Sequence, residues 1–137
     1  MPEKQFDLIA IPLWPRLIVA LGILLLGTGA IIALVHPILL VSPHDQINQA
    51  TRIYAGYLAS RNMALAVMLF LTMARRANKA LNTLILLTAV IQLFDVVMDI
   101  SEGRWAVLPG VVILGVLFLV ASARISGHPF WKKEAWM

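Results

Sequence analysis

Cysteine is absent from this chain, and only 13% of its 137 residues are charged. Without cysteine, a small secreted module held together by disulfides is excluded. Soluble domains are about 25% charged and about 45–50% apolar, whereas this chain is 61% hydrophobic. The mean hydropathy of +0.87 also excludes intrinsic disorder, which requires low hydrophobicity and high net charge. The composition therefore indicates a membrane protein.

Long apolar runs make up most of what is present. A transmembrane helix needs about 20 predominantly apolar residues, and four stretches satisfy or approach this: about 17–35, 53–74, 81–100 and 105–123. The first run is longer than the usual apolar region of a signal peptide, so we expect it to be an uncleaved helix. We predict an all-α integral membrane four-helix bundle, with residues 1–137 forming one four-span transmembrane domain.

The start of the second helix carries its own signal. Ser42 is a suitable N-cap, Pro43 suits the first helical position, and Asp45 places an acid in the first turn. This pattern predicts that the helix begins near Pro43 and extends about two exposed turns before it enters the bilayer.

Basic residues are distributed unevenly between the two sides of the four spans. Lysine and arginine mark the cytoplasmic side of a membrane protein, and only Arg52 and Arg104 fall on the opposite side. The chain lacks a transit-like leader, which favours a bacterial inner (plasma) membrane. We therefore expect both termini to be cytoplasmic and the basic residues to contact anionic lipids rather than nucleic acid. Eight basic residues lie on that side: Lys4, Arg16, Arg75, Arg76, Lys79, Arg124, Lys132 and Lys133.

Three ionisable residues fall inside spans, namely Arg61, Asp95 and Asp99. Inserting an ionisable side chain into a bilayer costs free energy, so such residues are candidates for a functional site. Arg61 and Asp95 have opposite charge, and at about 1.5 Å per residue they lie roughly 12 Å and 7 Å inside the outer ends of their helices. We therefore predict an ion pair between the second and third helices, in the outer half of the membrane.

Helical spacing groups further polar residues with this pair. Gln92 lies on the same face of the third helix as both aspartates, and Tyr54 and Tyr57 share a face of the second helix with Arg61. Next to that face, small residues repeat at every fourth position, a pattern that lets helices approach closely. We expect this stripe, consisting of Gly56, Ser60 and Ala64, to be the packing face of the second helix.

This arrangement suggests a catalytic division of roles. Two carboxylates one turn apart in a low-dielectric environment are not easily ionised together. Asp95 would stay charged beside Arg61, and Asp99 would donate or accept a proton. The tyrosines, Asn62 and Gln92 are the candidate ligand-binding residues. Acid–base chemistry of this kind suits isomerisation, cyclisation or epoxide opening of a lipophilic molecule.

Other chemistries have weaker support. His36 and His128 are predicted at opposite ends of the bundle, and His44 with Asp45 lacks a familiar zinc-ligand spacing. Motifs for a serine nucleophile or a phosphate-binding loop are absent. We therefore expect no metal and no cofactor.

The order of polar residues resembles a known family. Arg61 followed by Asn62 early in one span, a basic turn at 75–79 and Asp95 late in the next span are similar to small four-span membrane proteins of bacteria and fungi. That family is catalogued as a domain of unknown function and is DoxX-like in outline. The resemblance covers about residues 54–126. It implies four helices and a polar pair in the outer half, and it brings no established activity.

Two functions remain open from the sequence. The first is a membrane protein whose outward-opening polar pocket binds a lipophilic small molecule, with its transformation by acid–base chemistry as an optional extension. The second is an accessory subunit of a larger membrane complex or a homo-oligomer, in which the Arg61–Asp95 pair only holds the bundle together. A drug/proton exchanger is disfavoured because the polar residues gather on one side of the membrane.

Overall fold

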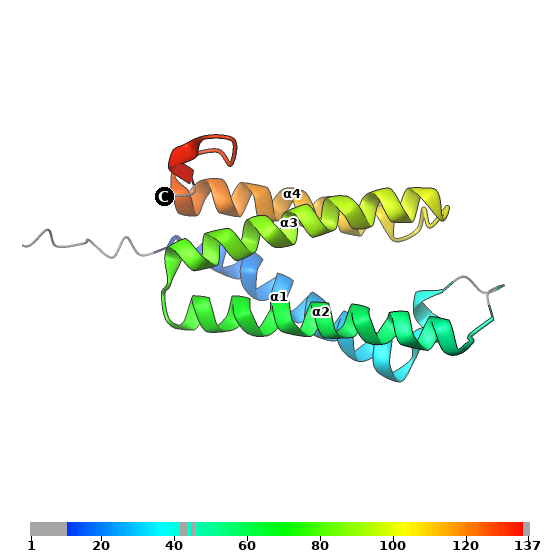
Figure 1. The fold of residues 1–137 in the computed structure, drawn as a ribbon. Coiled ribbons are helices and arrows are strands. Elements are labelled where there is room, and N and C mark those ends of the chain that lie inside the picture. The colour runs from blue at the N-terminus through cyan, green and yellow to red at the C-terminus, as the bar shows by residue number, and fades with distance from the viewer. Residues whose placement is uncertain (1–10, 42–43, 45, 136–137) are drawn as a thin grey trace, which may run out of the picture.

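The computed structural model describes residues 11–41, 44 and 46–135 (Figure 1). Its elements are α1 (Leu13–Val35), η1 (Pro37–Leu40), α2 (Gln49–Ala74), α3 (Asn78–Ser101), α4 (Leu108–Ser126) and η2 (Lys133–Ala135), where η marks a short 3₁₀ helix. All four α-helices are long and apolar enough to cross a membrane. The all-α class and the four spans predicted from the sequence are therefore confirmed.

Helix α2 begins at Gln49, later than the predicted start near Pro43. Asn48 is the N-cap, and its side-chain oxygen accepts hydrogen bonds from the backbone N–H of Thr51 (2.9 Å) and from its hydroxyl (3.1 Å). This cap satisfies one of the free N–H groups of the first turn, so the helix starts here. Of the predicted start signal, Ser42, Pro43 and Asp45 lie outside the described residues.

Helix α4 begins three residues later than the predicted start at Trp105. Gly103 adopts a left-handed backbone conformation (φ 68°), which favours glycine. Hydrogen-bonded turns then carry the chain from Arg104 to Val107. These residues form the turn that reverses the chain direction after α3, so Trp105 belongs to this turn and not to α4. Pro109 occupies the first turn of α4, as expected from its missing N–H.

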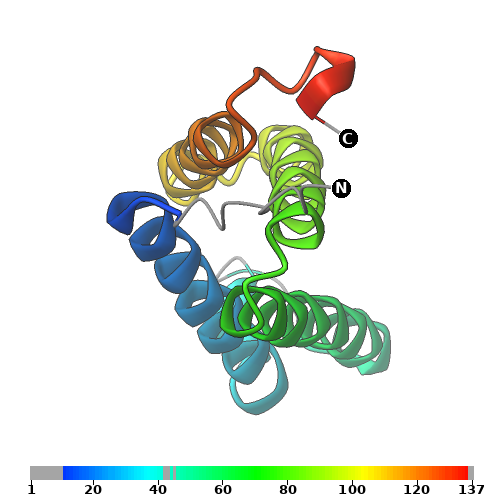
Figure 2. The same ribbon diagram turned by 90° about the vertical axis from the view of Figure 1, so that its left-hand side faces the viewer.

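The four helices form two hairpins. Helix α1 packs most extensively against α2, and α3 against α4, while α2–α3 and α1–α4 contacts are less extensive. Figure 1 shows α2 and α3 diverging from the short turn that joins them, and Figure 2 shows the four helices end-on. The hairpins are therefore close at the end that carries the α2–α3 turn, and they separate toward the other end. We call these the turn end and the open end.

The apolar core explains this separation. One cluster of buried residues draws on all four helices: Ile11, Val19, Leu26, Leu65, Ala66, Leu69, Leu81, Ile85, Ala89, Leu114 and Phe118. A second cluster, nearer the open end, consists of Ala30, Ala33 and Ala59, which come from α1 and α2 alone. Among the described residues, the apolar core shared by both hairpins therefore ends before the open end is reached.

One close contact between the hairpins joins α1 to α4. The fully buried ring of Phe118 lies directly over Gly22. A Cβ atom at position 22 would lie 2.7 Å from Cε1 of this ring and closer still to Cζ. Glycine is therefore required here for the hairpins to pack at this distance.

Helix α2 packs through a different face from the predicted one. Ser60 and Ala64 are exposed, and a Cβ atom at Gly56 would meet nothing within 4 Å. The contact with α1 is made instead by Ala59, which packs against Ala30 and Ala33. The prediction of a Gly56–Ser60–Ala64 packing face is wrong. Small residues also occur one position earlier, at Ala55 and Ala59, and these are the residues that pack against the alanines of α1.

The turn end is polar and basic. Ser122 of α4 donates a buried hydrogen bond of 2.7 Å to the side-chain oxygen of Asn82 of α3. Both chain ends of the described part lie at this end (Figure 1). The α2–α3 turn with Arg75, Arg76 and Lys79 also lies here, so the basic residues of loop and tail gather at one end. Lys4, which belongs to the same predicted set, lies outside the described residues.

Candidate functional site

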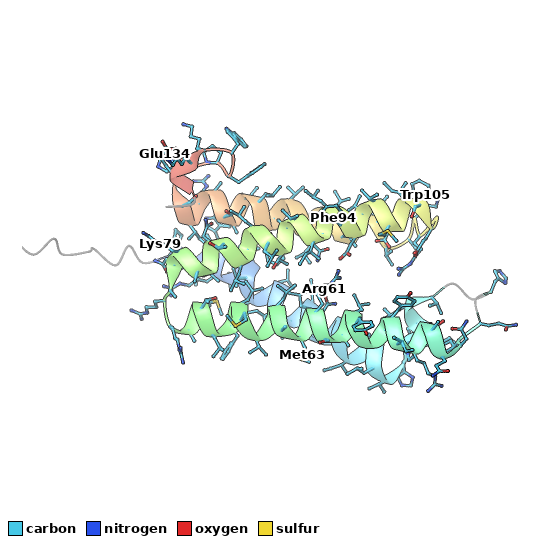
Figure 3. The ribbon with its side chains drawn as sticks, viewed as in Figure 1. Arg61, Met63, Lys79, Phe94, Trp105 and Glu134 are labelled. Atoms are coloured by element: carbon cyan, nitrogen blue, oxygen red, sulfur yellow. The ribbon has the colours of Figure 1, made fainter. Side chains whose placement is uncertain are left out.

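Arg61 on α2, labelled in Figure 3, forms an ion pair with Asp95 on α3 that joins the two hairpins. The Nη1 atom of Arg61 donates to Oδ1 of Asp95 at 3.3 Å, and Nη2 donates to Oδ2 at 3.2 Å. The Nε atom of Arg61 also donates to Oδ1 of Asn62 at 3.4 Å. The predicted pairing is confirmed, and its two-pronged geometry is the one in which arginine binds carboxylates most specifically.

The pair lies where the shared apolar core gives way to the open end. At about 1.5 Å per residue, Arg61 is roughly 18 Å from the start of α2 and Asp95 roughly 9 Å from the end of α3. Arg61 is further along its helix than the expected 12 Å because α2 begins at Gln49. The side chains of Arg61 and Asp95 are 38% and 32% exposed.

A second ion pair lies one turn further along α3. The Nη1 atom of Arg104 is 3.3 Å from Oδ1 of Asp99, whose side chain is only 9% exposed. The backbone N–H of Arg104 also donates to the carbonyl of Asp99 at 2.8 Å, which holds the turn against the helix end. Asp95 and Asp99 of α3 therefore each have a guanidinium partner of their own. The position of Arg104 at this end was predicted from the sequence, but its pairing with Asp99 was not. The signal was an arginine five residues after an acid, across a glycine turn.

Both ion pairs line one cavity of about 260 Å³ at the open end. This volume falls just below the range of about 300–1,000 Å³ for pockets that enclose a drug-sized ligand. The lining is Leu58, Arg61 and Asn62 from α2, Gln92, Asp95, Met98 and Asp99 from α3, and Glu102, Arg104, Val107 and Val111 from the turn and α4.

Gln92 differs from the other polar residues of the cavity. Only 8% of this residue is exposed, and within the part of the chain that the structure describes its amide has no hydrogen-bond partner. Its Cβ atom packs against Gly115 of α4, where an added Cβ would lie at 3.4 Å. A side chain with a free donor and a free acceptor is thereby held at the inner end of the cavity.

The predicted site residues divide into two groups. Arg61, Asn62, Gln92, Asp95 and Asp99 all line this cavity. Tyr54 and Tyr57 do not line it, and they are 71% and 70% exposed on the outer surface of α2. The structure therefore brings the charged and amide residues together and leaves the two tyrosines apart, so their role in binding stays a prediction.

A second cavity of about 310 Å³ adjoins the first and shares Arg104 and Val107 with it. Its other lining residues are mostly apolar and come from the segment after α1 and from the α3–α4 turn: Leu39, Leu40, Val41, Gly103, Trp105 and Ala106. The open end therefore offers a polar compartment and an apolar one, with Arg104 between them.

The histidines do not contribute to this site. His36 is the C-cap of α1 at the open end, and His128 follows α4 at the turn end. Across residues 11–41, 44 and 46–135, no group of three or more histidine, aspartate or glutamate side chains is placed to hold a metal ion. Asp45, the predicted neighbour of His44 in such a site, lies outside these residues.

Comparison with known proteins identifies no relative. No family model matches this chain, and neither the curated proteins nor the solved structures contain a significant match. The resemblance to the DoxX-like outline is therefore supported only in its coarsest part, four helices that can span a membrane.

Proposed function

We propose that this protein binds a lipophilic small molecule, with the polar group of that molecule held in the 260 Å³ cavity between the hairpins. One observation carries the proposal. In a chain that is 61% hydrophobic, five polar residues from two helices and an arginine from a turn converge on a single cavity. Polar side chains within spans are costly and are placed where they face a bundle interior or a cavity.

The proposed topology places this cavity on the outer side of a bacterial plasma membrane, with both termini in the cytoplasm. The uneven distribution of lysine and arginine supports this orientation. The basic turn between α2 and α3 and the basic tail after α4 lie together at the turn end (Figure 1). The cavity lies at the opposite end, among residues near the α3–α4 turn.

The proposal extends to acid–base chemistry on the bound molecule, with Asp99 as the group that exchanges the proton. Both carboxylate oxygens of Asp95 accept hydrogen bonds from Arg61. Asp99 instead approaches Arg104 through Oδ1, so Oδ2 is the carboxylate oxygen better placed to meet a ligand. A general base must lie within hydrogen-bond reach of the proton that it removes, and Asp99 lines the cavity while Arg61 and Asp95 hold its inner wall.

The accessory-subunit function has one observation in its favour. The Arg61–Asp95 pair connects the two hairpins, and all three guanidinium nitrogens of Arg61 are engaged in hydrogen bonds. In this function the bonds of Arg61 serve to hold α2 and α3 together. In that case the cavity would be a by-product of the separated hairpins.

The double variant Arg61→Met/Asp95→Leu distinguishes the two functions, because it removes both charges and leaves no charge unpartnered. The protein would be extracted with its native lipids, and co-purifying lipids and proteins would be identified by mass spectrometry. We expect the wild type to carry a lipophilic molecule at stoichiometric level and the double variant to fold and lose it. Arg124→Met is a matched control, because Arg124 lies over the ring of Trp14 at the turn end, away from the cavity.

A wild-type protein that carries no lipophilic molecule would contradict the proposal. So would a folded double variant that retains the molecule at the wild-type level. Loss of a co-purifying protein subunit from the double variant, with no lipid changed, would instead establish the accessory function.

A further inference from the structure

We infer that the group recognised in this cavity is uncharged: a hydroxyl or carbonyl oxygen that hydrogen-bonds to the amide of Gln92. The inference rests on the proposed binding function and names the class of ligand. It follows from the charges of the cavity lining and from the position of the Gln92 amide.

Each arginine of the cavity is paired with an aspartate, and Glu102 adds a third carboxylate to the lining. Arg61 is bonded to both oxygens of Asp95, and Arg104 lies against Asp99. The lining holds three carboxylates and only two guanidinium groups, so an anionic ligand would add a further negative charge without a partner. Uncompensated charges of this kind are strongly unfavourable. The charges of the lining therefore disfavour a carboxylate or phosphate headgroup.

Gln92 is the uncharged buried side chain that faces this cavity without a partner in the described part of the protein. The residue is more than nine-tenths buried, it lines the cavity, and its amide has no hydrogen-bond partner among the described residues. Neither atom of its amide belongs to the fully buried side-chain atoms without a partner, so the amide is accessible from the cavity, and a ligand that displaces water there can hydrogen-bond to it. An amide offers both donors and an acceptor, so it can donate to a carbonyl oxygen or bond in either sense with a hydroxyl.

The depth of Gln92 sets the shape of the ligand. Gln92 is seven residues before Asp99 on the same face of α3, or about 10 Å nearer the middle of the helix. The cavity is too small to enclose a whole lipid, and apolar side chains of Leu58, Met98 and Val111 complete its walls. A slender molecule whose oxygen reaches Gln92 and whose hydrocarbon tail leaves the cavity fits these limits. Long-chain alcohols, ketones and amides have this form.

A cationic headgroup is the competing class. Asp99 and Glu102 place two carboxylates near the mouth of the cavity, and Arg104 is the cation beside them. An ammonium group at this mouth would gain from the excess of negative charge without reaching Gln92. The two classes therefore differ in which residue they depend on.

A series of probes with one tail and four head groups tests the inference. Oleyl alcohol and oleamide carry uncharged heads, oleate is an anion and oleylamine is a cation. Binding to the full-length protein in nanodiscs would be measured by native mass spectrometry. We expect the two uncharged probes to bind at least tenfold more tightly than oleate or oleylamine. Gln92→Leu should weaken their binding about three- to tenfold, as expected for one lost hydrogen bond.

Thr83→Val is the matched control, because it removes a polar group from an exposed position near the other end of α3. It should leave the binding of all four probes unchanged. If Gln92→Leu does not fold, Gln92→Met tests the same loss of the amide with a flexible side chain.

The outcomes separate this inference from the function on which it rests. Tightest binding by oleylamine or oleate, with no effect of Gln92→Leu, would overturn the inference and leave a lipophile-binding protein. Binding of none of the four probes, together with no co-purifying lipophilic molecule, would overturn both.

Discussion

The contact between Gly22 and Phe118 allows a quantitative test of how the hairpins dock. In Gly22→Ala the new Cβ atom would lie 2.7 Å from Cε1 of the Phe118 ring and closer to Cζ. Carbon atoms pack at about 3.5–4.0 Å, so the ring would have to withdraw by about 1 Å or more. Phe118 has no exposed surface through which to do so. We expect the substitution to lower the free energy of unfolding by about 1–3 kcal/mol, the range for overpacked cores.

Gly27→Ala is the matched control on the same helix. A Cβ atom at Gly27 would meet nothing within 4 Å, so the substitution adds the same methyl group without a clash. Alanine has a higher helix propensity than glycine by up to about 1 kcal/mol, and this variant should be at least as stable as the wild type. Stability would be measured by reversible unfolding in mixed micelles, followed by circular dichroism.

The reasoning is refuted if Gly22→Ala and Gly27→Ala have equal stability. A double-mutant cycle with Phe118→Leu gives a second check, because the smaller side chain makes room for the alanine methyl group. The two substitutions together should then cost less than the sum of their separate effects.

Two further outcomes are expected. Asp95→Leu alone leaves Arg61 without its carboxylate and should destabilise the protein by about 1–3 kcal/mol. This is less than the roughly 3–5 kcal/mol for a fully buried pair, because the side chain of Arg61 is 38% exposed. Unfolding measurements should find that the double variant Arg61→Met/Asp95→Leu is more stable than this single variant. Ser122→Ala removes the 2.7 Å hydrogen bond to Asn82 and should cost about 0.6–1 kcal/mol; the same measurement checks this, and an unchanged stability would show that the bond contributes nothing.

The four spans and the Arg61–Asp95 ion pair could be predicted from the sequence alone. Charge within an apolar run is conspicuous, and helical periodicity fixes which face of a helix a residue occupies. Arg61 and Asp95 also lie inside their helices, where an error of a few residues in a boundary does not change the pairing. Helical periodicity also predicted that Gln92 and Asp99 share a face with Asp95, and all three line the cavity.

The remaining features depend on information that periodicity does not contain. Arg104 reaches Asp99 because Gly103 turns the chain back toward α3, and the path of a turn cannot be read from composition. The packing face of α2 was predicted wrongly because two sets of small residues, Gly56–Ser60–Ala64 and Ala55–Ala59, lie one position apart. Only the alanines that α1 presents, Ala30 and Ala33, decide between them.

The division into two hairpins has a consequence for how the chain assembles. Within each hairpin the contacts join helices that are neighbours in sequence, and contacts of this local kind form early and fast. Docking of one preformed hairpin on the other is then a separate and later event, dependent on Gly22, Phe118 and the shared core. We therefore expect the hairpins to persist in variants whose docking fails, as paired helices that have lost the cavity between them.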